Sequence, residues 1–110
     1  MSLKWMIMGN KTPVAVLLIL AASGNKRDMA ATTAILREFN RRKGSLTRDN
    51  TTLISVLFEN ASTSEEIRDA FKAIYTLFRE TQNPLYMVEV DQYEHLLQTI
   101  IDEYVEDAGQ

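Results

Sequence analysis

Apolar residues recur three and four positions apart through most of the chain, the spacing that buries one face of an α-helix. Outside Met1–Met8, whose pattern fits a strand, a helical arm or a disordered start, no segment has the alternation of a half-buried strand. We therefore expect an all-α fold of about five helices in a compact antiparallel or orthogonal array. The expected helices span about 12–23, from Asp28 to Lys43, from Asp49 or Asn50 to near Asn60, from the Ser62–Glu66 segment to Asn83-Pro84, and about 91–107.

Capping residues set the limits of the first two helices. Thr12 offers an N-cap hydroxyl, Pro13 suits the first turn, and Gly24 can take the left-handed conformation that follows a helix. Because the run from Val14 to Ala22 is apolar on every side, we expect neighbours to cover the first helix all round. Asp28 is the expected cap of the second helix.

The last two helices begin at hydroxyl-to-carboxylate or carboxylate pairs. Ser62 with Glu65, or Thr63 with Glu66, has the spacing of a capping box. Asp91 is the expected start of the last helix. Its apolar stripe is the cleanest in the chain and comprises Tyr93, Leu96, Leu97, Ile100, Ile101, Tyr104 and Val105.

A helical-hairpin repeat is a second way to organise these helices. Pairs of adjacent aliphatic residues begin at Leu17, Leu53 and Leu96, so they are 36 and 43 residues apart, near the period of helical-repeat arrays. The segment 49–54 resembles the first helix of a pentatricopeptide repeat, a family of hairpins that bind single-stranded RNA. The spacings are unequal, and we carry over none of that family's base-reading positions.

Length and composition exclude several classes of site. With 110 residues and 45% hydrophobic residues the chain forms one domain over 1–110, in which residues 1–11 can act as an N-terminal arm. There is no cysteine, and His95 is the single histidine. These counts exclude a disulfide framework, thiolate chemistry and a paired-histidine zinc site within one chain. We expect no cofactor and no metal.

Charge is divided unevenly along the chain. Residues 1–48 hold nine Lys and Arg against two acids, whereas residues 49–110 hold three against thirteen acids. This asymmetry indicates either that the basic half binds an anionic partner or that the two halves attract each other, within one chain or between chains.

The densest basic segment is the main candidate for a partner-binding surface. Arg37 and Arg41 share one helix face, and the remaining basic residues flank the turn that follows. Three interpretations are open: a solvated helix end, a surface for acidic proteins, or a phosphate-binding surface. With Trp5, which belongs to an apolar N-terminal patch, the candidate partner-binding residues are Arg37, Arg41, Arg42, Lys43, Arg48 and Trp5.

The candidates for a catalytic or metal-binding site are weaker than the candidate partner-binding surface. His95 lies one turn after Asp91, but no serine nearby has the glycine-rich elbow of a nucleophile, so we interpret it as a surface residue. The acidic end of the chain lacks the loop spacing of a calcium site. It is interpreted as a solvated tail or a surface for a basic partner, and comprises Asp102, Glu103, Glu106 and Asp107.

The expected function follows from these exclusions. Val14–Ala22 looks like the core of a secretory signal, but Pro13 opens it and the run is far below the ~20 residues that span a bilayer. We expect a cytoplasmic or otherwise intracellular protein with no membrane contact and no small-molecule substrate.

The expectation is a non-enzymatic protein-interaction module that self-associates through its basic and acidic halves. The alternative is a small RNA- or DNA-binding regulator that uses the cluster from Arg37 to Arg48.

Overall fold

The elements of the fold are all helices, which confirms the expected all-α class. The computed structural model describes residues 12–47 and 53–108. In chain order the helices are α2 (Pro13–Ala22), α3 (Lys26–Arg42), the single turn α4 (Gly44–Thr47), α5 (Leu53–Glu59), α6 (Ser64–Thr81) and α7 (Pro84–Ala108). The predicted start of the third helix, at Asp49 or Asn50, lies outside the described residues.

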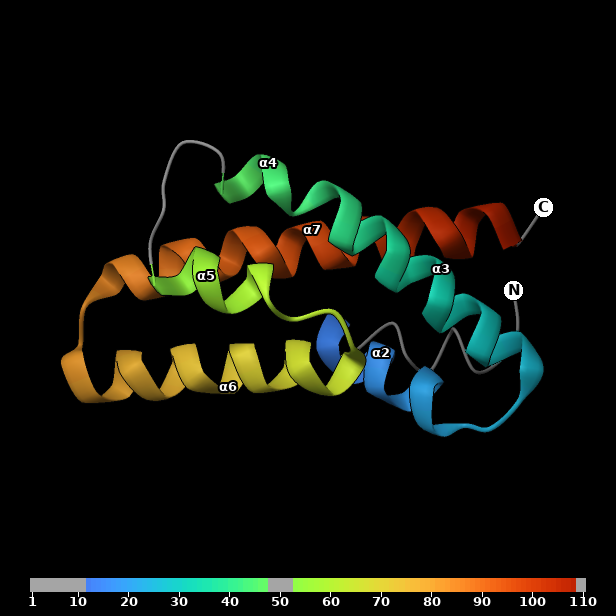
Figure 1. The fold of residues 1–110 in the computed structure, drawn as a ribbon, viewed down its shortest axis with the longest axis horizontal. Helices are drawn as coiled ribbons and strands as arrows, with labels where there is room; N and C mark the ends of the chain where they lie inside the picture. The colour runs from blue at the N-terminus through green and yellow to red at the C-terminus, as the bar shows by residue number, and fades with distance from the viewer. Residues whose placement is uncertain (1–11, 48–52, 109–110) are drawn as a thin grey trace.

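Two long helices form the frame of the molecule. Figure 1 shows α6 and α7 running antiparallel along the long axis, joined by a tight turn at one end. The short α5 lies against both of them, α3 packs along α7, and α2 packs against α3, α6 and α7. The molecule measures 41 × 26 × 21 Å along its principal axes.

Phe58 on α5 joins three helices in the core. Its side chain is fully buried, and its ring stacks on Tyr93 of α7 at a centroid distance of 4.1 Å. The Phe71 ring on α6 meets it edge to face at a centroid distance of 4.8 Å, and the Phe39 ring on α3 does so at 6.3 Å. Such aromatic pairs stabilise a fold beyond the area that they bury. The single apolar ring of a short helix therefore holds α5 against the frame.

The hydroxyl of Tyr93 is enclosed by this core. Among the described residues it has no hydrogen-bond partner, and burial raises its pKa to about 12. The predicted apolar stripe of the last helix is thus largely internal, since Tyr93, Leu97, Ile100 and Ile101 are each at most 3% exposed. This stripe packs the core and does not face outward to another chain.

The predicted caps of α2 and α6 are confirmed. The Thr12 hydroxyl accepts a hydrogen bond from the backbone N–H of Ala15, and Gly24 has a φ of 73°. Thr63 and Glu66 form the reciprocal capping box, so the second of the two predicted registers is the one adopted. The capping residues therefore predict these helix ends correctly.

Two expectations about the first two helices are wrong. The second helix starts at Lys26 and not at Asp28, because the Asn25 side chain accepts from the N–H groups of Arg27 and Asp28. Asp28 itself is buried in the first turn. In α2, Ile19 keeps 36% of its surface exposed, so neighbours do not cover this helix all round.

The last helix starts about two turns before its predicted limit. Pro84 occupies its first turn, and the Asn83 side chain accepts from the N–H of Leu85 at 3.1 Å. Proline is favoured in a first turn because its missing N–H would have no partner there. Asp91 therefore lies inside α7 and does not cap it. The longer helix reaches back along α6 to the turn between them.

Candidate functional site

The basic cluster at the end of α3 is divided by the structure into internal and external residues. Lys43 is only 7% exposed and Arg42 is half-buried, whereas Arg37 and Arg41 are exposed. Trp5 and Arg48 lie outside the described residues. The predicted residues are thus neighbours in sequence, but they do not form one continuous surface.

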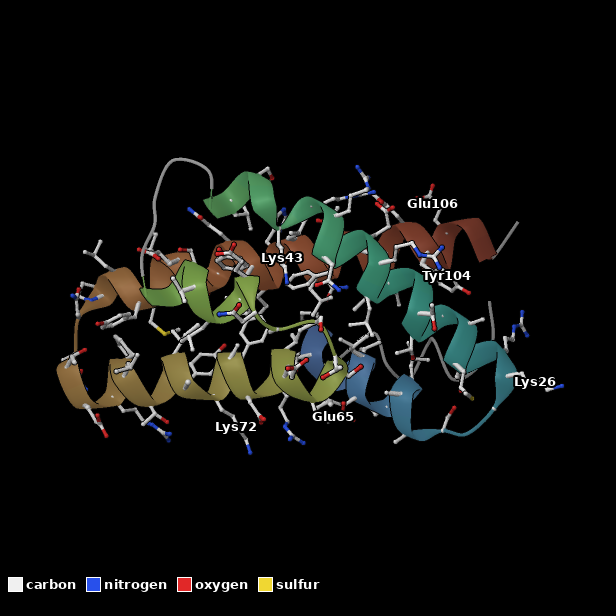
Figure 2. The ribbon with its side chains drawn as sticks, in the orientation of Figure 1. Lys26, Lys43, Glu65, Lys72, Tyr104 and Glu106 are labelled. Carbon is white, nitrogen blue, oxygen red and sulfur yellow. The ribbon has the colours of Figure 1, made fainter. Side chains whose placement is uncertain are left out.

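Lys43 points into the protein and closes the end of α5. Its ammonium group donates to the carbonyl oxygens of Phe58 at 2.7 Å, Ala61 at 2.8 Å and Glu59 at 3.3 Å. The ammonium also lies 5.9 Å from the centre of the Phe39 ring. The last carbonyls of a helix have no partner within the helix and carry its partial negative charge, so a cation is favourable there. Figure 2 shows Lys43 in this position between α3 and α5.

Burial lowers the pKa of Lys43 below its ordinary value, and the nearby carboxylates of Glu59 and Glu66 oppose that shift. With its three donors occupied, this lysine is a structural residue. Sequence alone gave no signal of that role, because the carbonyls it binds are 15 to 18 residues away along the chain.

Arg42 joins the basic half of the chain to the acidic half. Its guanidinium binds Glu103 of α7 with two hydrogen bonds, of 2.9 and 3.2 Å, and binds Glu38 one turn earlier on α3 at 2.9 Å. The hydrogen bonds with Glu103 are the main cause that raises the pKa of Arg42. Part of the charge asymmetry is therefore satisfied within one chain.

Arg41 is external but shares the same carboxylate. It binds Glu38 at 2.7 Å while 64% of its side chain is exposed. Hydrogen bonds from Arg41 and then Arg42 lower the pKa of Glu38, and the hydrogen bond with Glu38 raises the pKa of Arg41. The Glu38 carboxylate thus serves two guanidiniums, one of which, Arg42, also binds Glu103.

The exposed face of α3 is basic at both ends of the helix. Its exposed ionisable side chains are all cationic, whereas its two acids are buried or half-buried. The helix has 17 residues and is roughly 25 Å long. We call this surface the α3 basic face, and its charged members are Lys26, Arg27, Arg37 and Arg41.

Sequence reasoning missed Lys26 and Arg27 because it started the helix at Asp28. Once Asn25 is the cap, Lys26 and Arg37 are eleven residues apart, or three turns, and share one side of α3. Figure 2 shows Lys26 pointing away from the body of the molecule. The signal that could have found them is Asn25, an asparagine immediately before a long helical pattern.

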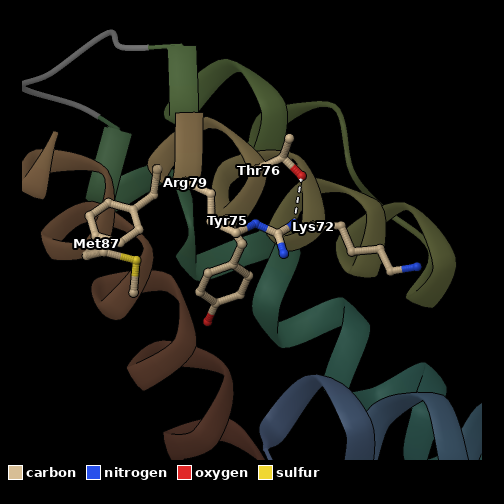
Figure 3. A pocket seen from close by; sticks show the side chains of 6 residues that line it. Lys72, Tyr75, Thr76, Arg79 and Met87 are labelled. Atoms are coloured by element: carbon tan, nitrogen blue, oxygen red, sulfur yellow. Dashed lines mark hydrogen bonds between the residues drawn. The ribbon is translucent and has the colours of Figure 1, made fainter. Parts of the chain in front are cut away.

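A second feature is a groove between α6 and α7. It has a volume of about 560 Å³ and is lined by Lys72, Tyr75, Thr76, Phe78, Arg79 and Met87. Figure 3 shows the Tyr75 ring and Met87 at its centre, with the Arg79 guanidinium donating to Thr76 at 3.3 Å. The groove therefore has an apolar floor and a basic wall on α6.

The α7 side of the groove is acidic. The Tyr75 hydroxyl donates to the Glu94 carboxylate at 3.1 Å. Burial is the main cause that raises the pKa of Tyr75, and the negative charges of Glu94 and Asp91 raise it further. Within the described residues, neither Lys72, Arg79 nor Asp91 forms an ion pair.

The remaining chemical candidates have ordinary surroundings. His95 is exposed on α7, and Glu94 beside it is bonded to Tyr75. At the acidic end, Asp102 accepts from Gln98 and Glu103 binds Arg42. Over the described ranges 12–47 and 53–108, no three histidines or acids lie close enough together to hold a metal ion.

Comparison with known proteins adds no relative. No family model, no curated protein and no solved structure matches the chain. Among the described helices none is both long and apolar enough to cross a membrane.

Proposed function

We propose that the chain is a non-enzymatic helical protein-interaction module that self-associates, the α3 basic face of one copy binding acidic side chains of another. The observation that carries this proposal is the α3 basic face itself, where Lys26, Arg27, Arg37 and Arg41 are exposed and Arg41 shares the Glu38 carboxylate with the half-buried Arg42. Such a surface attracts anionic partners over several ångströms of water.

Acidic side chains on the same molecule supply the complementary surface. Apart from Glu59 at the end of α5, the exposed acids of the acidic half that the structure describes lie on α6 and α7, where they outnumber the basic residues. They are Glu65, Glu66, Asp69, Glu80, Asp91, Asp102, Glu103 and Glu106. One chain carries both the basic face and the acidic side chains that can bind it. A second copy of the chain is therefore the partner that we propose.

Sedimentation velocity at about 50 mM and about 500 mM salt tests this proposal. Screening shortens the range of exposed charges as salt rises, so association is expected at low salt and should weaken at high salt. Arg37→Glu should weaken the low-salt association several-fold. Arg68→Glu is the matched control, because it changes the net charge equally on α6. A monomer at high concentration in both salts, or equal effects of the two variants, would contradict the proposal.

Nucleic acid is the second candidate ligand of the same face. The small side chains of Ala30 and Thr33 are exposed between the basic ends of the face, which allows a phosphate backbone to approach closely. Against this, α3 exposes no aromatic side chain on which a base could stack. Gel retardation of generic RNA and DNA at about 50 mM salt separates the two ligands, since phosphate contacts are strongest there. Binding that Arg37→Glu with Arg41→Glu removes would favour nucleic acid, and no retardation by the unmodified protein would exclude it.

A further inference from the structure

The most exposed large apolar side chains that the structure describes lie together on α7. Leu85 is 62% exposed and Val88 is 56% exposed, and they are three residues apart, so they share one side of the helix. Met87, between them in sequence, lines the groove between α6 and α7. Single exposed apolar residues are normal, but an exposed aliphatic residue such as Val88 at the rim of a groove with an apolar floor can extend an interaction surface.

The walls of this groove carry opposite charge. Lys72 and Arg79 line it from α6, whereas Glu94 and Asp91 of α7 lie beside Tyr75, Glu94 bonded to the Tyr75 hydroxyl and Asp91 acting on it through its charge. Arg79 and Asp91 are also level with each other along the hairpin. The Arg79 guanidinium reaches back to Thr76, and Asp91 acts on Tyr75, the residue before Thr76.

A second copy fits this pattern if it is rotated about a two-fold axis that runs along the groove. Such a rotation places α6 of one copy over α7 of the other and keeps every residue at its own level. The basic wall then faces the acidic wall twice, and Arg79 of each copy comes opposite Asp91 of the other. Val88 lies about a quarter turn around α7 from Met87, at the edge of the same face, where a second hairpin can cover it, whereas Leu85 lies further around the helix.

We infer that the groove between α6 and α7 is an interface with a second copy of this chain, the two hairpins packing face to face as a four-helix unit. This inference rests on the proposed self-association and gives it a surface of its own, separate from the α3 basic face. Because its centre is apolar, this contact persists at high salt, where the contact through α3 is screened. The two surfaces are therefore separable by experiment.

The first experiment is sedimentation equilibrium at about 1 M salt, where the Debye length is ~3 Å. The unmodified protein is expected to be a dimer. Val88→Asp should raise the dimer dissociation constant at least about tenfold, since it puts a charge where an aliphatic side chain would be buried. Met29→Asp is the matched control, because Met29 is 53% exposed on α3, away from the groove. It should leave the constant unchanged.

The second experiment tests the paired charges at about 100 mM salt, in protein that carries Arg37→Glu so that the α3 contact is weakened. Arg79→Glu alone and Asp91→Lys alone should each weaken the dimer, because each places like charges opposite one another. The two changes together should restore it, since the pair is then re-formed with its signs exchanged. Restoration would not follow from a merely structural role of either residue.

Three outcomes would overturn the inference: a monomer at about 1 M salt, a Val88→Asp protein that dimerises as tightly as the unmodified one, or no restoration in the double exchange. An assembly seen only at low salt and lost in Arg37→Glu would support the proposed function and reject the groove. A dimer at high salt that Arg37→Glu leaves intact and Val88→Asp breaks would support the groove and not the α3 contact.

Discussion

A lysine that looks like part of a surface cluster is the internal cap of another helix. Lys43 follows Arg41 and Arg42 in sequence, yet its ammonium group is bonded to three backbone carbonyls at the end of α5. Periodicity could not predict this, because the direction of Lys43 depends on where α5 lies. The exposure of Arg37, in contrast, follows from its position opposite the apolar side of α3.

Replacing Lys43 should therefore destabilise the fold. Lys43→Met keeps most of the length of the side chain but leaves the carbonyls of Phe58 and Ala61 without their donor, so the free energy of unfolding should fall by about 1–3 kcal/mol. Arg41→Met, at an exposed position, should change it by less than about 0.5 kcal/mol. Urea unfolding of the two variants measures both values. Equal effects would show that the bonds of Lys43 contribute nothing to stability.

At the scale of elements, the helix starts that the sequence predicts correctly are those marked by a strong capping residue or capping pair. Thr12 and the Thr63–Glu66 pair are such caps, and α2 and α6 begin where they indicate. For α7, Asn83-Pro84 is expected only to end the preceding helix, and Asp91 with Glu94 to begin the next. Choosing between them requires knowing that α7 packs against the last turns of α6, and the sequence pattern does not contain that contact.

The capping box of α6 should make stability depend on pH. Hydrogen bonds from the backbone N–H groups of Thr63 and Ser62 lower the pKa of Glu66 below its ordinary value of 4.5. Since the folded-state pKa is the lower one, the ionised carboxylate stabilises the fold above pH 4.5, and this contribution is lost as the pH falls through the lowered value.

Glu66→Gln tests this dependence. The variant should melt below the unmodified protein at pH 7, and the difference should shrink on acidification, because Glu66 is then uncharged as well. Glu65→Gln removes an equal charge from the first turn of α6 but leaves the capping box intact, so it controls for the helix dipole. Thermal melts across the acid range give the comparison. A difference that stays constant with pH would mean that the charge of Glu66 has no part in the cap.

At the scale of the whole molecule, the uneven charge of the chain has two consequences. Within one copy, Arg42 ties α3 to α7 through Glu103. Outside it, the α3 basic face remains available on one side, and the groove between α6 and α7 keeps opposite charges apart on its two walls. The sequence could predict the asymmetry but not this division, because the division depends on which arginines face α7. Arg42 is half-buried beside α7, whereas Arg37 is exposed on the outer side of α3.

A double-mutant cycle on Arg42 and Glu103 measures how strongly this pair holds the basic and acidic halves of one copy together. Arg42→Ala and Glu103→Ala should each lower the free energy of unfolding, and the double variant should lower it by less than their sum. With 29% and 50% of the two side chains exposed, solvent screens the pair, so a coupling of about 0.2–1 kcal/mol is expected. Coupling in this range should fall as salt is added, because exposed charges are screened. Arg41 and Glu103, which share no hydrogen bond and interact only through their charges, provide the comparison cycle and should show a smaller coupling. If the first cycle gave no coupling at low salt, the attraction between the two halves of the chain would have to act between copies alone, and the α3 basic face would gain Arg42 as a member.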